Sequence, residues 1–199
     1  MELEALTNAV LARIFIEMEA SGRHAHVTKE QAQTLFGHGL TPQRDLSQPG
    51  QFLARERVTV IGPKGKFQNV AVLGPERPEG QVEISLTDAR MLGIDAPIRL
   101  SGDVQNTPGA VLEGPEGTVT LEKGVIAAKR HIHMTPESAA LMGVKDRQIV
   151  ELQTYTARPL VFRDVAVRVS PDFRTRVHLD YDEANACGLK SGDLGRIVK

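Results

Sequence analysis

The 199-residue chain is 41% hydrophobic and 25% charged, which is ordinary for a globular protein with a buried core and allows one domain or two small ones. Its 24 lysines and arginines almost balance its 25 acidic residues, which argues against a nucleic-acid-binding protein, because such a protein needs surplus cations. No apolar run approaches the roughly 20 residues that cross a bilayer, and the acidic residues near the start argue against a signal peptide. The single cysteine, Cys187, excludes an internal disulfide. Together these features predict a cytoplasmic protein.

The first part of the chain predicts two helices with a strand between them. Residues 1–15 are expected to form an amphipathic helix, because their apolar side chains recur at helical spacing. Residues 15–27 alternate in the manner of a strand. A short helix is expected over residues 29–36, with Thr28 as its N-cap and Gly37 as its end.

The rest of the chain predicts a mainly β fold with short helices. β-Branched segments at residues 58–61 and 70–73 are separated by Gly62-Pro63-Lys64-Gly65, which is typical of a hairpin turn. A second turn of this kind is Gly114-Pro115-Glu116-Gly117, and a short helix is expected over residues 87–92. This spacing is typical of a small β-barrel or sandwich with helices between the strands.

The chain contains an internal repeat. Residues 23–28 (Arg-His-Ala-His-Val-Thr) return as residues 130–135 (Arg-His-Ile-His-Met-Thr), and residues 67–94 align without a gap with residues 162–189. The two halves are therefore predicted to be related folding units that divide in the polar, turn-rich residues 101–108. The expected organisation, which leaves open an exchange of segments between barrels, is an N-terminal helix, a first β-barrel half and a second β-barrel half, over residues 1–15, 16–104 and 105–199.

Four of the six histidines form two His-x-His pairs, one in each copy of the repeat. On a strand, the alternation of side chains puts both imidazoles of a pair on one face, where they can chelate a single ion. Glu83 and His178 occupy equivalent positions in the aligned halves and supply a third candidate ligand each. Two metal sites are therefore predicted, with the ligands His24, His26 and Glu83 in the first, and His131, His133 and His178 in the second.

Zinc is the preferred metal for both predicted sites, with two ions per chain. Three imidazoles, or two imidazoles and a carboxylate, suit zinc, with copper, nickel, cobalt and iron as competitors. Two histidines and one carboxylate are also the iron ligands of non-haem iron oxygenases, but the second site, with three histidines, argues against iron. Three protein ligands with an open position are typical of a catalytic zinc. The sixth histidine, His38, lies in a Gly-His-Gly segment and is expected to be an exposed loop residue.

From about residue 16 to residue 194 these motifs resemble the PduL-type phosphotransacylases, the phosphate propanoyltransferases associated with bacterial microcompartments. The stretches that carry the resemblance are residues 21–26, 40–42, 45–52, 58–65, 72–75, 81–85, 128–136 and 182–186. The resemblance implies two β-barrel domains, usually in a dimer, with a two-zinc active site between them and the same two ligand sets. It also implies that Arg77 holds the phosphate, which spacing alone would not suggest.

The resemblance implies a reversible transfer of an acetyl or propanoyl group between coenzyme A and inorganic phosphate. It further implies a location inside a bacterial microcompartment, with shell-protein contacts through residues 1–14. Where the family commonly reads Ile-Pro-Val-Gly-Val-Ser after a linker, this chain has Ile-Glu-Met-Glu-Ala-Ser at residues 16–21, directly after the helix. That difference leaves open whether residues 1–14 are an encapsulation peptide or pack on the barrel. The ligands alone would also allow a binuclear zinc hydrolase of esters or phosphoesters, or a non-catalytic barrel stabilised by zinc.

Overall fold

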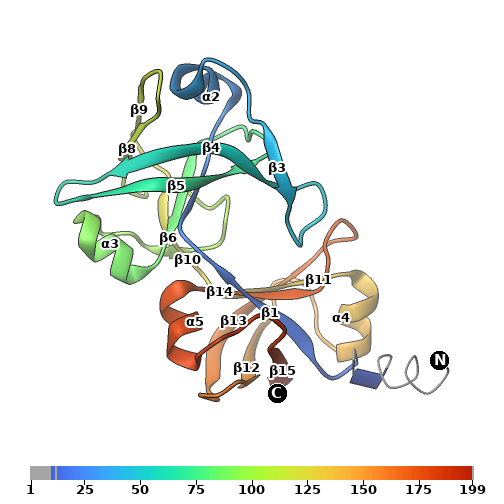
Figure 1. The fold of residues 1–199 in the computed structure, drawn as a ribbon. Helices are drawn as coiled ribbons and strands as arrows, with labels where there is room; N and C mark the ends of the chain where they lie inside the picture. Colours follow the sequence, from blue (N-terminus) through green and yellow to red (C-terminus); the bar gives the residue numbers. More distant parts are fainter. Residues whose placement is uncertain (1–9, 12, 199) are drawn as a thin grey trace. The chain divides into compact units, whose positions relative to one another are not determined.

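The protein is described from a computed structural model, which covers residues 10, 11 and 13–198. The predicted helix over residues 1–15 therefore lies largely outside the described residues. The chain divides into two compact units. Unit 1 comprises residues 1–21 and 129–199, and unit 2 comprises residues 22–128. Each unit is built mainly of strands with short helices (Figure 1).

Unit 2 contains one strongly curved, half-barrel sheet and two helices (Figure 1). The strands run in the order β7-β10-β6-β2-β5-β4-β8-β9, and β3 pairs with β4. The strands are β2 (His24–His26), β3 (Pro42–Asp45), β4 (Phe52–Ile61), β5 (Lys66–Gly74), β6 (Gln81–Ile84), β7 (Ile98–Arg99), β8 (Ala110–Glu113), β9 (Thr118–Leu121) and β10 (Val125–Ala128), and the helices are α2 (Lys29–Phe36) and α3 (Leu86–Leu92).

Local sequence signals explain where these elements begin and end. Helix α2 starts with a capping box, in which the Gln31 backbone N–H donates to Thr28 Oγ1 and the Thr28 N–H donates to Gln31 Oε1. It ends at Gly37, whose φ of 75° is the left-handed conformation that glycine adopts without strain. The turn between β4 and β5 is closed by a hydrogen bond from Gly62 N–H to the Gly65 carbonyl at 2.9 Å. The predicted helix limits and hairpin turns of this unit are therefore confirmed.

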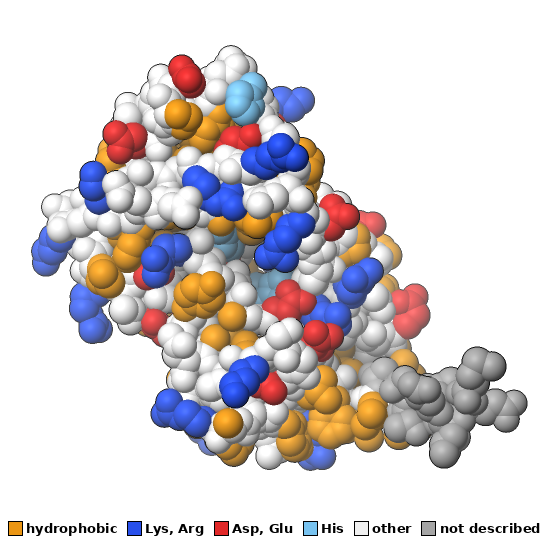
Figure 2. All heavy atoms as spheres, in the orientation of Figure 1, with side chains coloured by type: hydrophobic (Ala, Val, Ile, Leu, Met, Phe, Trp, Pro, Cys, Tyr) orange, Lys and Arg blue, Asp and Glu red, His pale blue; other side chains and the backbone are white. Residues whose placement is uncertain are grey.

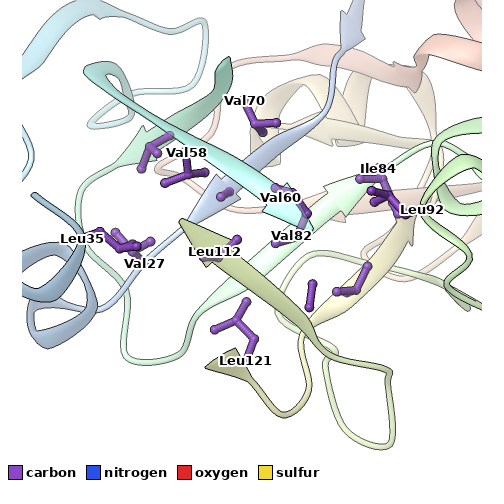
Figure 3. Close-up of a cluster of buried hydrophobic side chains, with 14 of the residues drawn as sticks. Val27, Leu35, Val58, Val60, Val70, Val82, Ile84, Leu92, Leu112 and Leu121 are labelled. Carbon is purple, nitrogen blue, oxygen red and sulfur yellow. The ribbon is translucent and has the colours of Figure 1, made fainter. Parts of the chain in front are cut away.

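The core of unit 2 is made mainly of aliphatic side chains, with Phe36 as its buried aromatic residue, in keeping with the scarcity of aromatic residues in the sequence. Figure 3 shows them gathered between the strands and the helices. They come from the strands and from both helices, with Val58 and Val60 on β4, Leu35 on α2 and Leu92 on α3 each at most 2% exposed. Burial of a Val or Leu side chain contributes about 1.5–3 kcal/mol relative to exposure, so this cluster holds the curved sheet together.

Unit 1 is a closed six-stranded barrel in the order β1-β14-β11-β13-β12-β15. Its strands are β1 (Ile16–Ser21), β11 (His131–Met134), β12 (Ile149–Tyr155), β13 (Val161–Val169), β14 (Arg176–Asp180) and β15 (Leu194–Val198), and its helices are α4 (Pro136–Met142) and α5 (Tyr181–Cys187). Cys187 is fully buried in its core, so it packs as a small apolar side chain.

The internal repeat is visible in strand pairing. In unit 2, β2 lies between a parallel neighbour, β5, and an antiparallel neighbour, β6. In unit 1, β11 lies in the same way between β13 and β14. Even an unusual backbone angle recurs, because the aligned residues Asn69 and Asp164 have φ angles of 57° and 56°. The prediction of a mainly β fold in two repeat-related, barrel-like units is confirmed.

The division of the chain differs from the expected ranges 16–104 and 105–199. β1 is connected to β2 in sequence, but its hydrogen bonds are with β14 and β15, so it belongs to the barrel of residues 129–199. Residues 105–128 join unit 2, because β8 pairs with β4 and β10 pairs with β6. The strand that precedes each His-x-His pair is thus built into the sheet of the other half of the sequence.

The surface carries charges of both signs. Lys and Arg side chains and Asp and Glu side chains both occur on the visible face of each unit (Figure 2), as the formal net charge of −1 suggests. Among the helices of the described residues, none combines the length and the apolar character that a membrane crossing requires.

Candidate metal centres

The first centre consists of His24, His26 and Glu83 in unit 2. The two histidines share one face of β2, and Glu83 on β6 is the direct antiparallel partner of His24. Glu83 Oε1 lies 3.6 Å from His24 Nε2 and 3.8 Å from His26 Nε2. All three side chains are buried, and their potential ligand atoms lie within 4.8 Å of one another. The strand register therefore converges three donor groups on one point.

The second centre consists of His131, His133 and His178 in unit 1. The pair lies on β11, and His178 on β14 is the antiparallel partner of His131, in the register that His24 and Glu83 have in unit 2. The Nε2 atoms of His131 and His133 are 3.0 Å apart. The three potential ligand atoms again lie within 4.8 Å of one another. Both predicted ligand sets are thus brought together, each within its own unit.

Backbone carbonyls orient the imidazoles of the first histidine in each pair. His24 and His131 each place Nδ1 at 2.8 Å from the carbonyl oxygen two residues earlier in the chain. His26 Nδ1 makes a similar contact with the Leu73 carbonyl at 3.1 Å. A carbonyl oxygen can only accept, so Nδ1 carries the proton and the lone pair of Nε2 faces the centre. Such hydrogen bonds fix ring orientation and tautomer in metal-binding histidines.

The distances and donor types fit zinc. With bonds of about 2.0–2.1 Å in tetrahedral geometry, two ligand atoms of one zinc lie about 3.3–3.4 Å apart. The interatomic distances in the two centres include 3.0, 3.6 and 3.8 Å and none exceeds 4.8 Å, so modest side-chain movements bring the ligand atoms to that spacing. Imidazole and carboxylate groups are ordinary zinc ligands.

The electrostatics of the first centre favour the metal-binding protonation states of Glu83 and His26. Burial alone would raise the pKa of Glu83, but attraction to His24 and His26 and a hydrogen bond with Ser101 outweigh it and hold that pKa well below its ordinary value. The pKa of His26 is lowered well below its usual value by burial and by the positive charges of His24 and Arg77. Burial also disfavours charged His24, but Glu83 beside it raises the pKa of His24 overall, so a metal that binds here displaces a proton from His24. A carboxylate and a neutral imidazole are the species that coordinate a metal.

Arg77 lies beside the first centre. Its Nη1 donates to Ser101 Oγ at 2.9 Å, and Gln81 Nε2 donates to the same oxygen at 3.0 Å and to Glu83 Oε1 at 2.6 Å. The loop that carries Arg77 is fixed by a hydrogen bond from its backbone N–H to the Val27 carbonyl at 2.9 Å. A continuous set of hydrogen bonds therefore connects the Arg77 guanidinium to a candidate metal ligand.

Sequence reasoning missed Gln81 and Ser101 as members of this site. Gln81 is two residues before Glu83 on β6, so strand alternation places both on one face and could have identified it. Ser101 carries no such signal, because it lies in the polar, turn-rich segment that predicts a boundary between the halves. His38, with a side chain that is 58% exposed, occupies the loop that the sequence predicted.

An ion pair beside each His-x-His pair also follows the repeat. Arg23, immediately before His24, binds both carboxylate oxygens of Asp88 at 2.8 and 3.1 Å, and its guanidinium lies over the Phe67 ring. At the equivalent positions Arg130 pairs with Glu183. Asp88 and Glu183 lie in the first turn of α3 and α5, so each pair ties a histidine-bearing strand to the helix that follows the third ligand.

The fold and the two centres define a class of duplicated β proteins in which each half carries a candidate metal centre of the same design. Comparison with known proteins identifies the family. A family model described as phosphate propanoyltransferase matches residues 17–190. Curated relatives with that name include proteins from Enterococcus faecalis (57% identity over 185 residues, 92% of this chain and 88% of the relative) and Clostridioides difficile (52% over 199 residues, 99% and 95%). A relative of the same name from Thermotoga maritima is 54% identical over 182 residues, 90% of this chain and 87% of its own length.

The chain belongs to the phosphate propanoyltransferase family. It is therefore an enzyme, a phosphotransacylase. The resemblance inferred from the motifs is confirmed.

Proposed function

We propose that this enzyme transfers a short acyl group, acetyl or propanoyl, reversibly between coenzyme A and inorganic phosphate, with one zinc ion in each centre. The observation that carries the proposal is the connection of Arg77 through Ser101 and Gln81 to Glu83. It puts a cationic group that suits a phosphate next to a candidate metal site. The name of the relatives, phosphate propanoyltransferase, supports propanoyl as the acyl group and phosphate as the acceptor.

Arg77 binds and orients the phosphate in this proposal. A guanidinium presents several N–H donors in a planar fork, which matches two oxygens of a phosphate. Ser101 holds one of these nitrogens in place, so less conformational freedom is lost when the anion binds. The face visible in Figure 2 carries charges of both signs, so a local group such as Arg77 accounts for phosphate binding better than a broad positive field does.

The two ligand sets would each hold one metal ion within their own unit, and only the first set is shown beside Arg77, which binds the phosphate in this proposal. Zinc bound by these residues would supply a Lewis acid for the thioester carbonyl and a good partner for the departing thiolate. A phosphate oxygen attacks the carbonyl carbon of the acyl-CoA, a C–O bond forms, and the C–S bond breaks with both electrons going to sulfur. Arg77 remains on the phosphate throughout and neutralises part of its charge. Because thioesters and acyl phosphates are both high-energy compounds, the transfer runs in either direction.

The proposal extends to assembly and location. We assign a homodimer, and a cytoplasmic location within a bacterial microcompartment, on the basis of kinship. Residues 1–14 are the segment assigned to contact shell proteins. In its described part, Val10, Leu11 and Ile14 are exposed, which supports an apolar contact surface. Light scattering tests the dimer, and fusion of residues 1–14 to a fluorescent protein tests targeting to the compartment.

The decisive test follows the release of coenzyme A thiol from acetyl-CoA and propanoyl-CoA with and without phosphate. The proposal predicts release only when phosphate is present, with one acyl phosphate formed per thiol. Thiol release at the same rate without phosphate would identify water as the acceptor and would replace the proposal with a hydrolase.

A further inference from the structure

A carboxylate outside the predicted ligand sets lies beside the second centre. Glu19 on β1 is the parallel partner of His178 on β14. Glu19 Oε2 lies 3.7 Å from His178 Nε2, and Glu19 Oε1 accepts a hydrogen bond from Arg176 Nε at 3.0 Å. One oxygen of the carboxylate is thus held by a guanidinium and the other faces a candidate ligand.

The distance matches those within the first centre. There, Glu83 Oε1 lies 3.6 and 3.8 Å from the two histidine Nε2 atoms. Glu19 Oε2 therefore lies about as far from one histidine Nε2 as Glu83 Oε1 lies from two of them, although Glu19 is on a different strand and is more exposed.

In the two centres the carboxylate comes from strands that are not equivalent in the repeat. Unit 2 has Glu83 at the position equivalent to His178. The parallel neighbour of Glu83 on β10 is Ile126, which is fully buried. In unit 1 the central position is an imidazole, and the neighbouring position on β1 is Glu19. When Glu19 is included, each centre contains one carboxylate.

The surrounding charges fix where Glu19 points. Arg176 binds Glu17 through Nη2 at 2.9 Å and Glu19 through Nε at 3.0 Å. Its two contacts hold both carboxylates on the face of β1 and β14 that carries His178, because residues two apart on a strand share a face. The Glu19 side chain is about one-third exposed and that of His178 is 18% exposed, so their interaction is partly shielded from water.

We propose that Glu19 is a positioning residue of the second centre, whose carboxylate orients His178 and balances the charge of the cation bound there. This inference rests on the proposed metal binding. Three neutral imidazoles leave the charge of a divalent ion uncompensated, whereas one nearby carboxylate reduces it to the value that Glu83 gives the first centre. Loss of an outer-shell partner of a ligating histidine typically costs about 10- to 100-fold in metal affinity.

The test measures zinc affinity of the second centre by competition with a chromophoric chelator. The full-length His26→Ala variant serves as background, because it lacks a ligand of the first centre, so the measured zinc affinity is that of the second centre. In this background Glu19→Gln is expected to weaken zinc binding by about 10- to 100-fold. Glu19→Asp, which keeps the charge on a shorter side chain, is expected to restore part of the affinity.

Glu17→Gln is the matched control, because it removes a carboxylate from the same strand and the same arginine. It is expected to change zinc affinity by less than about twofold, in line with the small effects of exposed ion pairs. An unchanged zinc affinity in Glu19→Gln, or an equal loss in Glu19→Gln and Glu17→Gln, would overturn the role of Glu19 but would leave the proposed metal site standing. A His26→Ala background that binds no zinc while circular dichroism shows it folded would overturn the proposed second metal site as well.

Discussion

His24 lies directly opposite Glu83 across an antiparallel strand pair, and the repeat places His131 opposite His178 in the same register. The convergence of each ligand set is therefore fixed by backbone hydrogen bonds between two strands, and not by flexible loops. A site built in this way keeps its donors in place before a metal arrives, which reduces the entropy lost on binding.

Replacement of a ligand in the second centre should remove activity without unfolding the protein. We expect His131→Ala and His178→Ala to reduce phosphate-dependent thiol release to the uncatalysed level, because two remaining donors hold zinc poorly. Circular dichroism should show an unchanged β spectrum. His38→Ala, which removes an exposed loop histidine, is the control and should retain full activity. Normal turnover of His178→Ala after rigorous removal of metal would contradict the assignment.

Arg77→Ala should mainly impair the use of phosphate. Loss of a hydrogen bond to a charged partner costs about 1.5–3 kcal/mol, so kcat/KM for phosphate should fall by roughly 10- to 150-fold. The KM for acyl-CoA should change little. Arg163→Ala, which removes an arginine whose side chain is 83% exposed, is the control. The same phosphate dependence in Arg77→Ala as in the native enzyme would remove Arg77 from the site.

Ser101→Ala should act on phosphate through Arg77. The serine oxygen accepts from both Arg77 and Gln81, so its removal leaves the guanidinium less ordered. We expect a smaller rise in the phosphate KM than Arg77→Ala gives. The double variant should resemble Arg77→Ala, because the two side chains act as one unit. Additive effects in this double-mutant cycle would show that Ser101 and Arg77 act independently.

Arg23→Met should destabilise unit 2. Asp88 is buried and loses its two charge-assisted hydrogen bonds with Arg23, which costs about 1.5–3 kcal/mol. Arg99→Met is the matched control, because the pair of Arg99 with Asp103 is solvent-exposed and such pairs contribute about 0–1 kcal/mol. Urea denaturation followed by circular dichroism measures both changes. Equal shifts of the unfolding midpoint in the two variants would contradict a structural role for Arg23.

Much of the fold was predictable because its signals are local. Thr28, Gly37 and the Gly-Pro turns act within a few residues, and the repeat revealed equivalent positions without knowledge of the fold. The ligand sets were predictable for the same reason, since alternation along a strand aligns His24 with His26, and the repeat aligned Glu83 with His178.

The contacts that sequence reasoning missed join distant parts of the chain. β1 pairs with β14 rather than with strands near it in sequence, and Glu19 and Arg176 are 157 positions apart. Local propensity does not specify these long-range contacts. The repeat does not reveal the carboxylate of Glu19 beside His178 either, because the residue aligned with Glu19 is Ile126 on β10. Ser101 reaches its site from a turn whose polar composition is also typical of a linker.

The central claim is that each unit binds one metal ion through its own ligand set. Elemental analysis of the zinc-loaded protein tests it directly, through the ratio of zinc to chain. We expect two zinc ions in the native protein, one in His26→Ala, one in His133→Ala and none in the double variant, all folded by circular dichroism. A ratio that does not change on loss of these histidines, or a native protein that is fully active without bound metal, would contradict it.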